Sequence, residues 1–173
     1  VLRLLDFHGG TRRNWNGLSR VGIEHASHVP GCGPVPSDWC VVGEGPGRDE
    51  DRKQEPFVGK TGEEMRRFMD GESLPAFDDV FRTNIYRYFG GKDYEYSDED
   101  LARDEPELIA ELEACQPKVI VAVGRHAARW FLGNEVTFDE VGGLPWLVDI
   151  DQLIATKRDS YGSSKDRPSP SVG

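Results

Sequence analysis

The sequence predicts an α/β fold, a three-layer sandwich in which a central, mainly parallel sheet of about four strands carries helices on both faces. The run KVIVAVG at 118–124 is the clearest strand, and its continuous Val/Ile content is typical of burial on both faces of a parallel sheet. Two further apolar runs, at 39–43 and 80–86, have the length of strands. Helical patterns alternate with these runs, which indicates strand–helix–strand units.

The first half of the chain supplies two strands and one helix. Residues 39–43 (WCVVG) form a short apolar run that ends in glycine, which favours a buried strand. In 61–70 (TGEEMRRFMD), Thr61 can cap a helix, two glutamates suit its positive first turn, and a glycine ends it. Residues 80–86 (VFRTNIY) are rich in β-branched and aromatic side chains and predict the second strand. Residues 43–59 are expected to form a long polar loop.

The second half supplies two more helices around the strand at 118–124. Ser97, with Asp100 three residues later, predicts a helix start, and the helical pattern continues to about Cys115. Pro106 is expected to divide this helix, because proline lacks the N–H that a helix interior needs. Residues 125–132 predict the next helix, which ends before a glycine.

The expected organisation is one domain with irregular ends, which suits a chain of 173 residues. Residues 1–38 contain Gly, Pro, Asn and His without clear periodicity, so we interpret them as a loop-rich lead-in. Residues 39–150 form the α/β domain. The C-terminal segment 151–173, with its stretch SYGSSKDRPSPSVG, is expected to be irregular and flexible.

Composition limits the classes of partner and location. The net charge of −10 argues against a generally basic nucleic-acid coat, although a local basic groove remains compatible with it. The sequence has no apolar run of membrane-spanning length, and VLRLLDFHGG becomes polar too soon for a signal peptide. This start lacks an initiator Met, as expected of a fragment or a processed chain. The three cysteines, Cys32, Cys40 and Cys115, cannot all pair internally, so we expect reduced thiols in a cytoplasmic protein.

Two short motifs resemble a phosphate-binding loop and a zinc site, but each lacks a required residue. Gly59-Lys60-Thr61 resembles the end of a phosphate-binding loop, but such a loop needs a glycine five positions before its last glycine, and Gln54 occupies that position. An NTPase is therefore disfavoured. His25 and His28 with Cys32 suggest a zinc set, but the fourth ligand is missing, so we expect no metal. His126, at the start of a predicted helix, is expected to lie on the surface or to serve packing.

Three longer segments point to one family. The stretch GEGPGRDEDRKQEPFVGKTG at 43–62 resembles the first active-site motif of the uracil-DNA glycosylase superfamily, specifically of family 4. Here Gly45 replaces the usual alanine and Gln54 replaces the inner glycine. RTNIYRY resembles the family's T-N-V strand, and QPKVIVAVGRHAARWFLG resembles its third-strand segment. The match covers residues 39–133, and its order and spacing make it more specific than any single motif.

This resemblance implies residues that hold a flipped uracil base. The ring of Phe57 would stack on the base, and the amide of Asn84 would match uracil O4 and N3–H. Gly43 and Gly45 would let the backbone approach the base and the sugar. The structural alternatives are a core anchor for Phe57 and a strand-end cap for Asn84, and the resemblance favours the base contacts over both.

The resemblance also implies a carboxylate that positions water or stabilises positive charge on the sugar. Glu44 and Glu50 are the catalytic candidates, and Asp51 is a weaker third. Glu50 and Asp51 are also compatible with a solvated acidic face. No lysine is placed for a Schiff base, so we expect hydrolysis without lyase activity.

Two features of the family are not found. Its iron–sulfur members carry four cysteine ligands, two of them near the T-N-V strand and the following helix, where residues 87–88 and 103–105 contain no cysteine. Because a cluster needs about four thiolates, we expect no 4Fe-4S cluster and no other cofactor. The late His-Pro-Ser motif has its nearest counterpart at 169–173, with Ser169 in the place of His.

The sequence therefore predicts a monofunctional, monomeric uracil-DNA glycosylase of base-excision repair, a hydrolase that binds uracil-containing DNA and no membrane. The alternative is a catalytically impaired module of the same fold that binds DNA or a protein partner. The net charge of −10, the missing cluster ligands and the missing histidine favour the alternative. The presence of Glu44, Glu50, Phe57 and Asn84 favours the enzyme.

Overall fold

The computed structural model describes residues 2–5, 26–72, 74–135, 137, 142–143 and 145–162. They form a five-stranded sheet in the order β3-β2-β4-β1-β5. Four strands are mutually parallel, and the short edge strand β5 is antiparallel to β1. The strands are β1 (Leu2–Leu5), β2 (Trp39–Gly43), β3 (Phe81–Asn84), β4 (Val119–Val123) and β5 (Pro145–Trp146). The predicted α/β class with a mainly parallel sheet is confirmed.

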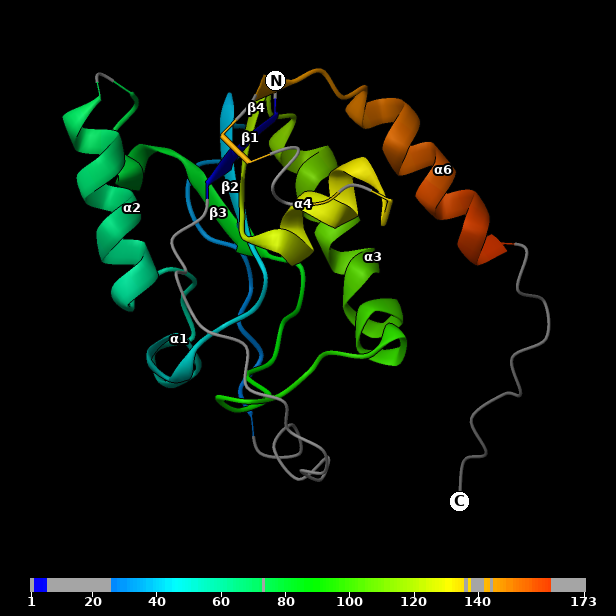
Figure 1. Cartoon of the computed structure of the whole chain (residues 1–173), viewed down its shortest axis with the longest axis horizontal. Helices are drawn as coiled ribbons and strands as arrows, with labels where there is room; N and C mark the ends of the chain where they lie inside the picture. The colour runs from blue at the N-terminus through cyan, green and yellow to red at the C-terminus, as the bar shows by residue number, and fades with distance from the viewer. Residues whose placement is uncertain are drawn as a thin grey trace.

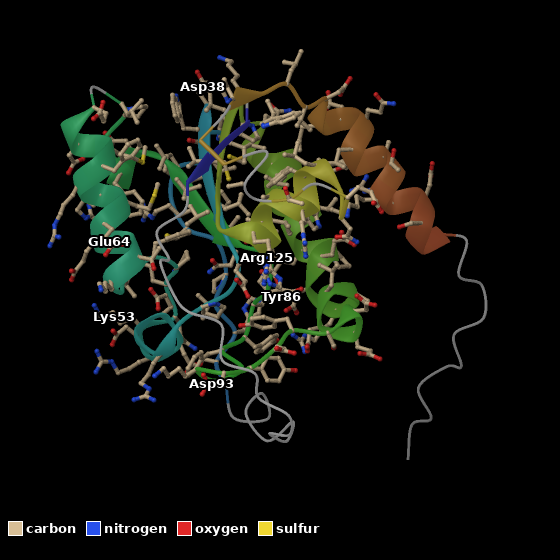
Figure 2. All side chains as sticks on the ribbon, in the orientation of Figure 1. Asp38, Lys53, Glu64, Tyr86, Asp93 and Arg125 are labelled. Carbon is tan, nitrogen blue, oxygen red and sulfur yellow. The ribbon has the colours of Figure 1, made fainter. Side chains whose placement is uncertain are left out.

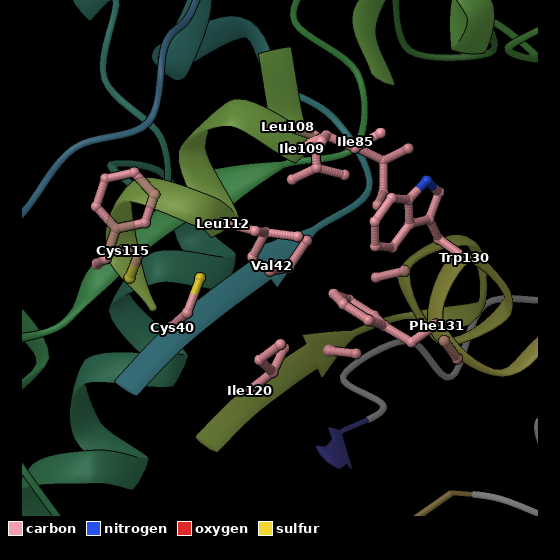
Figure 3. Close-up of a cluster of buried hydrophobic side chains, with 14 of the residues drawn as sticks. Cys40, Val42, Ile85, Leu108, Ile109, Leu112, Cys115, Ile120, Trp130 and Phe131 are labelled. Atoms are coloured by element: carbon pink, nitrogen blue, oxygen red, sulfur yellow. The ribbon is translucent and has the colours of Figure 1, made fainter. Parts of the chain in front are cut away.

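Helices cover both faces of this sheet. In Figure 1, α2 (Lys60–Gly71) lies on one side of the strands, and α3 (Asp98–Cys115) and α4 (Arg125–Leu132) lie on the other. Side chains alternate between the two faces along β2, so Val41 packs toward α2 while Val42 packs toward α3 and α4. Figure 3 shows the buried cluster between the sheet and the helices α3 and α4, with Val42 close to Leu112 of α3.

Two helices differ from the sequence prediction, one inside the expected loop 43–59 and one at Pro106. The loop after β2 contains the short helix α1 (Arg48–Lys53), and α3 continues through Pro106 without a break. The two residues before the proline anchor α3 to neighbouring elements. Asp104 accepts a hydrogen bond from the Arg87 backbone N–H at 2.9 Å, and Glu105 accepts one from Trp130 Nε1 at 2.6 Å. These buried contacts stabilise the helix where proline removes one of its own hydrogen bonds.

Both chain ends contain regular structure that the sequence did not indicate. The expected lead-in contributes β1, which pairs in parallel with β4 from Leu2 opposite Ile120 to Leu5 opposite Val123. The expected irregular end begins with α6 (Ile150–Gly162), although 163–173 lie outside the described residues. Asp149 caps α6 by accepting a hydrogen bond from Gln152 N at 3.0 Å, and Ile154 of α6 joins the core. Among the described helices, none is both long and apolar enough to cross a membrane.

The carboxyl ends of the parallel strands meet at one edge of the sheet. Figure 2 shows this edge on the side of Tyr86 and Arg125, whereas Asp38, which precedes β2, lies at the other end. Gly43 and Asn84 stand opposite each other as the last residues of β2 and β3. Ligands of open α/β sheets bind outside this edge. The candidate site residues therefore belong to the strand ends and to the loops that follow them.

Candidate active site

Gly43, Phe57 and Asn84 meet at the carboxyl ends of β2 and β3. A Cβ placed on Gly43 would collide with Asn84 Oδ1 and would lie 2.8 Å from Phe57 Cζ. Glycine is therefore the residue that lets the aromatic ring and the amide approach the same backbone. A Cβ on Gly62 of α2 would likewise collide with the Phe57 carbonyl oxygen. The resemblance grouped Gly43, Phe57 and Asn84 by their motifs, and the fold brings them into contact.

Phe57 is presented by an unusual turn. Its φ of 59° lies in the left-handed region, which non-glycine residues rarely adopt. The ring is 8% exposed and meets Phe77 edge to face, with 6.3 Å between the ring centroids. Phe57 therefore belongs to the core cluster under α2, and its ring tip reaches Gly43. The two interpretations of this residue, core anchor and contact for a base, are compatible in this geometry.

Asn84 presents a side-chain amide at the carboxyl end of β3. The residue is 4% exposed, and its amide makes no hydrogen bond to another described residue. Neither amide atom is among the fully enclosed polar atoms without a partner in that part of the chain, which are Arg87 Nε and Arg129 Nε. The backbone beside it is well fixed, because Ile85 N donates a hydrogen bond to the Gly43 carbonyl at 2.9 Å. Most polar side chains of largely buried residues are hydrogen-bonded within the protein, so an amide that no described residue engages at the strand ends is a candidate contact for a ligand. The amide can donate to one ligand atom and accept from another.

Glu50 is fully engaged by backbone amides. Gly47 N donates to Glu50 Oε2 at 3.1 Å, and Gly59 N donates to Glu50 Oε1 at 2.7 Å. These glycines are the N-cap residues of α1 and α2, so one carboxylate caps both helices. The neighbouring Asp51 accepts a hydrogen bond from Ser27 N at 2.6 Å and ties residue 27 to the same loop.

Glu44 presents the more open carboxylate. Its backbone carbonyl accepts a hydrogen bond from Tyr86 N at 2.8 Å, which fixes the chain just after β2. The Glu44 side chain is 42% exposed, and among the described residues its one ion-pair partner is His126, with 3.7 Å between Oε1 and Nε2. Gly45 follows directly, and a Cβ there would lie 2.5 Å from the Tyr96 hydroxyl oxygen. This close packing explains glycine at position 45.

A pair of tyrosines borders the site and was not found by sequence reasoning. The rings of Tyr86 and Tyr96 stack with 3.9 Å between centroids and 3° between planes. Burial, together with the Glu44 charge, raises the pKa of Tyr86 to about 12, and burial raises the pKa of Tyr96 as well. Both phenols therefore stay neutral near pH 7. The sequence did contain one signal for Tyr86: it follows Asn84 by two residues, and an extended chain would place both side chains on the same side of the sheet.

The cysteines do not fit the iron–sulfur cluster that the resembling family implies. Cys40 and Cys115 are buried in the core, where Figure 3 shows them close together, while Cys32 accepts a hydrogen bond from Arg82 Nη2 at 3.1 Å. The hydrogen bond with Cys115 and burial hold the pKa of the Cys40 thiol well above its usual value. A buried thiol that is held protonated, as Cys40 is, is a poor metal ligand.

Ion pairs occupy the two neighbourhoods, 87–88 and 103–105, in which the resemblance implies cysteine ligands, with Arg103 paired to Asp104 at 2.6 Å in the second. Arg87 is 1% exposed, and its guanidinium donates to Glu111 Oε2 at 2.7 Å and to Thr83 Oγ1 at 2.7 Å. Glu111 also accepts from Gly31 N at 2.7 Å, which ties the segment before β2 to α3.

The zinc set considered from the sequence is likewise unsupported, since His28 pairs with Glu107 at 2.7 Å and His25 lies outside the described residues. In the described part of the chain, no group of three His, Cys, Asp or Glu side chains is arranged to hold a metal.

Comparison with known proteins decides the family. The sequence profile of the Uracil DNA glycosylase superfamily matches residues 30–168, which is most of the chain. The chain belongs to the uracil-DNA glycosylase superfamily. The matched region contains all six site residues predicted from the sequence, Gly43, Glu44, Gly45, Glu50, Phe57 and Asn84.

Curated relatives of this superfamily member are type-4 uracil-DNA glycosylases. The enzyme from Archaeoglobus fulgidus is 36% identical over 104 residues, which are 60% of this chain and 52% of the relative. The enzyme from Thermotoga maritima is 34% identical over 142 residues, 80% of this chain and 73% of the relative. The enzyme from Saccharolobus solfataricus is 28% identical over 102 residues, 59% and 47% of the two chains. The chain spans about half the length of the Archaeoglobus and Saccharolobus relatives.

Proposed function

We propose that this protein is a monofunctional DNA glycosylase that hydrolyses the N-glycosidic bond of deoxyuridine in DNA during base-excision repair. The single observation that carries the proposal is the Asn84 amide, which no described residue engages and which lies beside Gly43 and the Phe57 ring. Family membership supports N-glycosidic hydrolysis as the reaction class. The unpaired amide supports a planar, hydrogen-bonding ligand at the strand ends.

The Asn84 amide suits uracil and disfavours cytosine. Its N–H₂ donates to a carbonyl such as uracil O4, and its carbonyl accepts from an N–H such as uracil N3–H. Cytosine reverses this pattern on the same edge, so it would leave both groups unpaired. As the C1′–N1 bond breaks, the base leaves with the electron pair and becomes an anion. A donor that is already fixed beside O4 stabilises this negative charge without reorganisation.

Glu44 is the carboxylate that we assign to the sugar and the water. In the reaction, the water oxygen bonds to C1′ while a nearby carboxylate accepts the released proton and faces the positive charge on the sugar. The half-exposed Glu44 side chain is accessible to such a water. Glu50 remains a catalytic candidate, but its two hydrogen bonds to backbone N–H groups favour a role in holding the Phe57 turn.

DNA binding by an acidic protein requires local rather than global attraction. Lys53, Lys60 and Arg125 are exposed on or next to the loops around the site, and each is a candidate contact for a DNA phosphate. The net charge of −10 makes binding weaker than that of a basic protein, and the few phosphate contacts set its salt dependence. We also propose that the enzyme acts as a monomer without an iron–sulfur cluster or another cofactor. The hydrogen bonds of Cys32 with Arg82 and of Cys40 with Cys115 support the absence of an iron–sulfur cluster.

The proposed activity is tested with a labelled single-stranded oligonucleotide that contains one uracil. After incubation with the protein, heating in alkali breaks the strand at each abasic site. We expect breakage at uracil, none at a cytosine or thymine control, and strong loss with Asn84→Ala.

One observation favours the alternative of a non-catalytic module: Glu50 and Asp51, two of the three candidate carboxylates, both accept hydrogen bonds from the backbone and are held in structural contacts. Binding of the uracil oligonucleotide without any breakage, at protein in excess over DNA, would establish that alternative.

A further inference from the structure

Glu44 and His126 face each other across the ends of two neighbouring strands. Glu44 follows β2, and His126 is the second residue of α4, which begins directly after β4. The two side chains are 42% and 35% exposed, and 3.7 Å separates Glu44 Oε1 from His126 Nε2. This distance is within the range of an ion pair and slightly beyond that of a hydrogen bond. A small rotation of the Glu44 side chain closes the gap.

The His126 ring is held in place, whereas the Glu44 carboxylate is not. Gly124, with a φ of 86°, turns the chain from β4 into α4, and the buried Ala127 and Ala128 anchor the first turn of the helix. The His126 ring also meets Tyr86 edge to face, with 6.5 Å between centroids and 65° between planes. Tyr86 is in turn stacked on Tyr96. His126 therefore presents a fixed nitrogen to a carboxylate on a flexible stem.

We infer that His126 is a positioning residue that holds the Glu44 carboxylate in the orientation needed for attack of water on the sugar. This role rests on the proposed function. An Nε2–H that faces a carboxylate donates a hydrogen bond to one of its oxygens, which leaves the other oxygen for the water. DNA that covers the site excludes solvent from both side chains, and catalytic contacts that are long in the free protein shorten in such complexes.

The position of the residue explains why the sequence did not reveal it. His126 lies 82 positions after Glu44, and its neighbours predict an ordinary helix start. The pairing arises because β2 and β4 are adjacent and parallel, so that the residues following both strands emerge at one edge.

The test separates the chemical step from DNA binding. Single-turnover excision and DNA affinity are measured for the wild type, His126→Ala, His126→Gln and Glu44→Gln, and for the double variant of His126→Ala with Glu44→Gln. We expect His126→Ala to lower the single-turnover rate about tenfold, less than the roughly 100-fold that a 1 Å misplacement can cost, with DNA affinity within about twofold. Glutamine at position 126 can still donate a hydrogen bond and should restore most of the rate.

The double variant provides the decisive comparison. In the Glu44→Gln background, His126→Ala should change the rate by less than about twofold, because residues that act as a unit are non-additive. His28→Ala is the matched control, since it removes another exposed histidine–glutamate pair outside the site and should leave the rate unchanged. Equal losses from His126→Ala in both backgrounds, or a loss confined to DNA affinity, would overturn the inference and mark His126 as a phosphate contact. A wild type that excises no uracil would overturn the proposed function, and this role with it.

Discussion

Replacing Asn84 with alanine should separate catalysis from folding. Asn84 is 4% exposed, and its amide makes no hydrogen bond to another described residue, so its removal breaks none of the hydrogen bonds within that part of the chain. We expect the free energy of unfolding to change by about 1 kcal/mol or less. The excision rate should fall about 100-fold, because one fixed donor to a developing anion is worth roughly 3 kcal/mol in the barrier.

The neighbouring Thr83 provides a control with the opposite profile. Its hydroxyl donates to Glu111 Oε2 at 2.6 Å and accepts from Arg87 Nη1 at 2.7 Å, so it belongs to the buried ion-pair network. Thr83→Val keeps the shape but removes both bonds, and should cost about 2 kcal/mol or more of stability. Its excision rate, measured without urea so that the variant is folded, should stay close to that of the wild type.

The assay combines single-turnover excision of uracil, DNA affinity and urea denaturation for both variants. Asn84→Ala should lose rate while it retains stability and DNA affinity, and Thr83→Val should lose stability while it retains rate. If Asn84→Ala were destabilised as much as Thr83→Val, and its rate and DNA affinity fell together, Asn84 would be a structural residue and the reasoning from its unpaired amide would fail.

Three further predictions concern other parts of the site. Phe57→Leu keeps most of the apolar volume and should lower the excision rate by about tenfold or more, since base stacking contributes roughly 1–3 kcal/mol. Lys60→Ala should change the rate little. The reverse result, or binding of ATP with magnesium, would refute the assignment of this loop to base stacking. Gly43→Ala should lower excision by about 100-fold, measured in the same assay, because its Cβ displaces both Asn84 and Phe57. Arg87→Met should lower the free energy of unfolding, measured by urea denaturation, by about 3–5 kcal/mol, because Glu111 loses its buried partner. A chelator should leave the stability of the wild type unchanged, and iron analysis should find no stoichiometric iron.

Local signals were sufficient for the central part of the fold. The helix expected at 125–132 has these bounds in α4, because glycines at positions 124 and 133 flank it on both sides. The Val/Ile run of β4 likewise gave its position within one residue at each end. By contrast, β1 has four residues, and it is a strand only because β4 offers it a partner more than a hundred residues away. Such pairing leaves no periodic pattern in the strand itself.

The site shows the same division between local and non-local information. Motif resemblance was enough to select Gly43, Phe57 and Asn84, because their spacing along the chain is characteristic. The partners of each carboxylate could not be predicted, since a hydrogen bond depends on where three or four segments meet in space. Glu44 and Glu50 are therefore similar candidates in the sequence, whereas in the structure one is half exposed and the other is saturated by backbone N–H groups.

The bonds of Glu50 also explain why a glycosylase-family loop resembles a phosphate-binding loop. The N-terminus of a helix attracts an anion, and a phosphate loop uses this property to bind a nucleotide. At the start of α2, the anion is the protein's own Glu50 carboxylate, which accepts the Gly59 N–H at 2.7 Å. The glycine at position 62 is required for close packing on the Phe57 carbonyl. The GKTG sequence therefore holds an aromatic ring beneath the strand ends, and its helix terminus is already neutralised by a residue of the same loop.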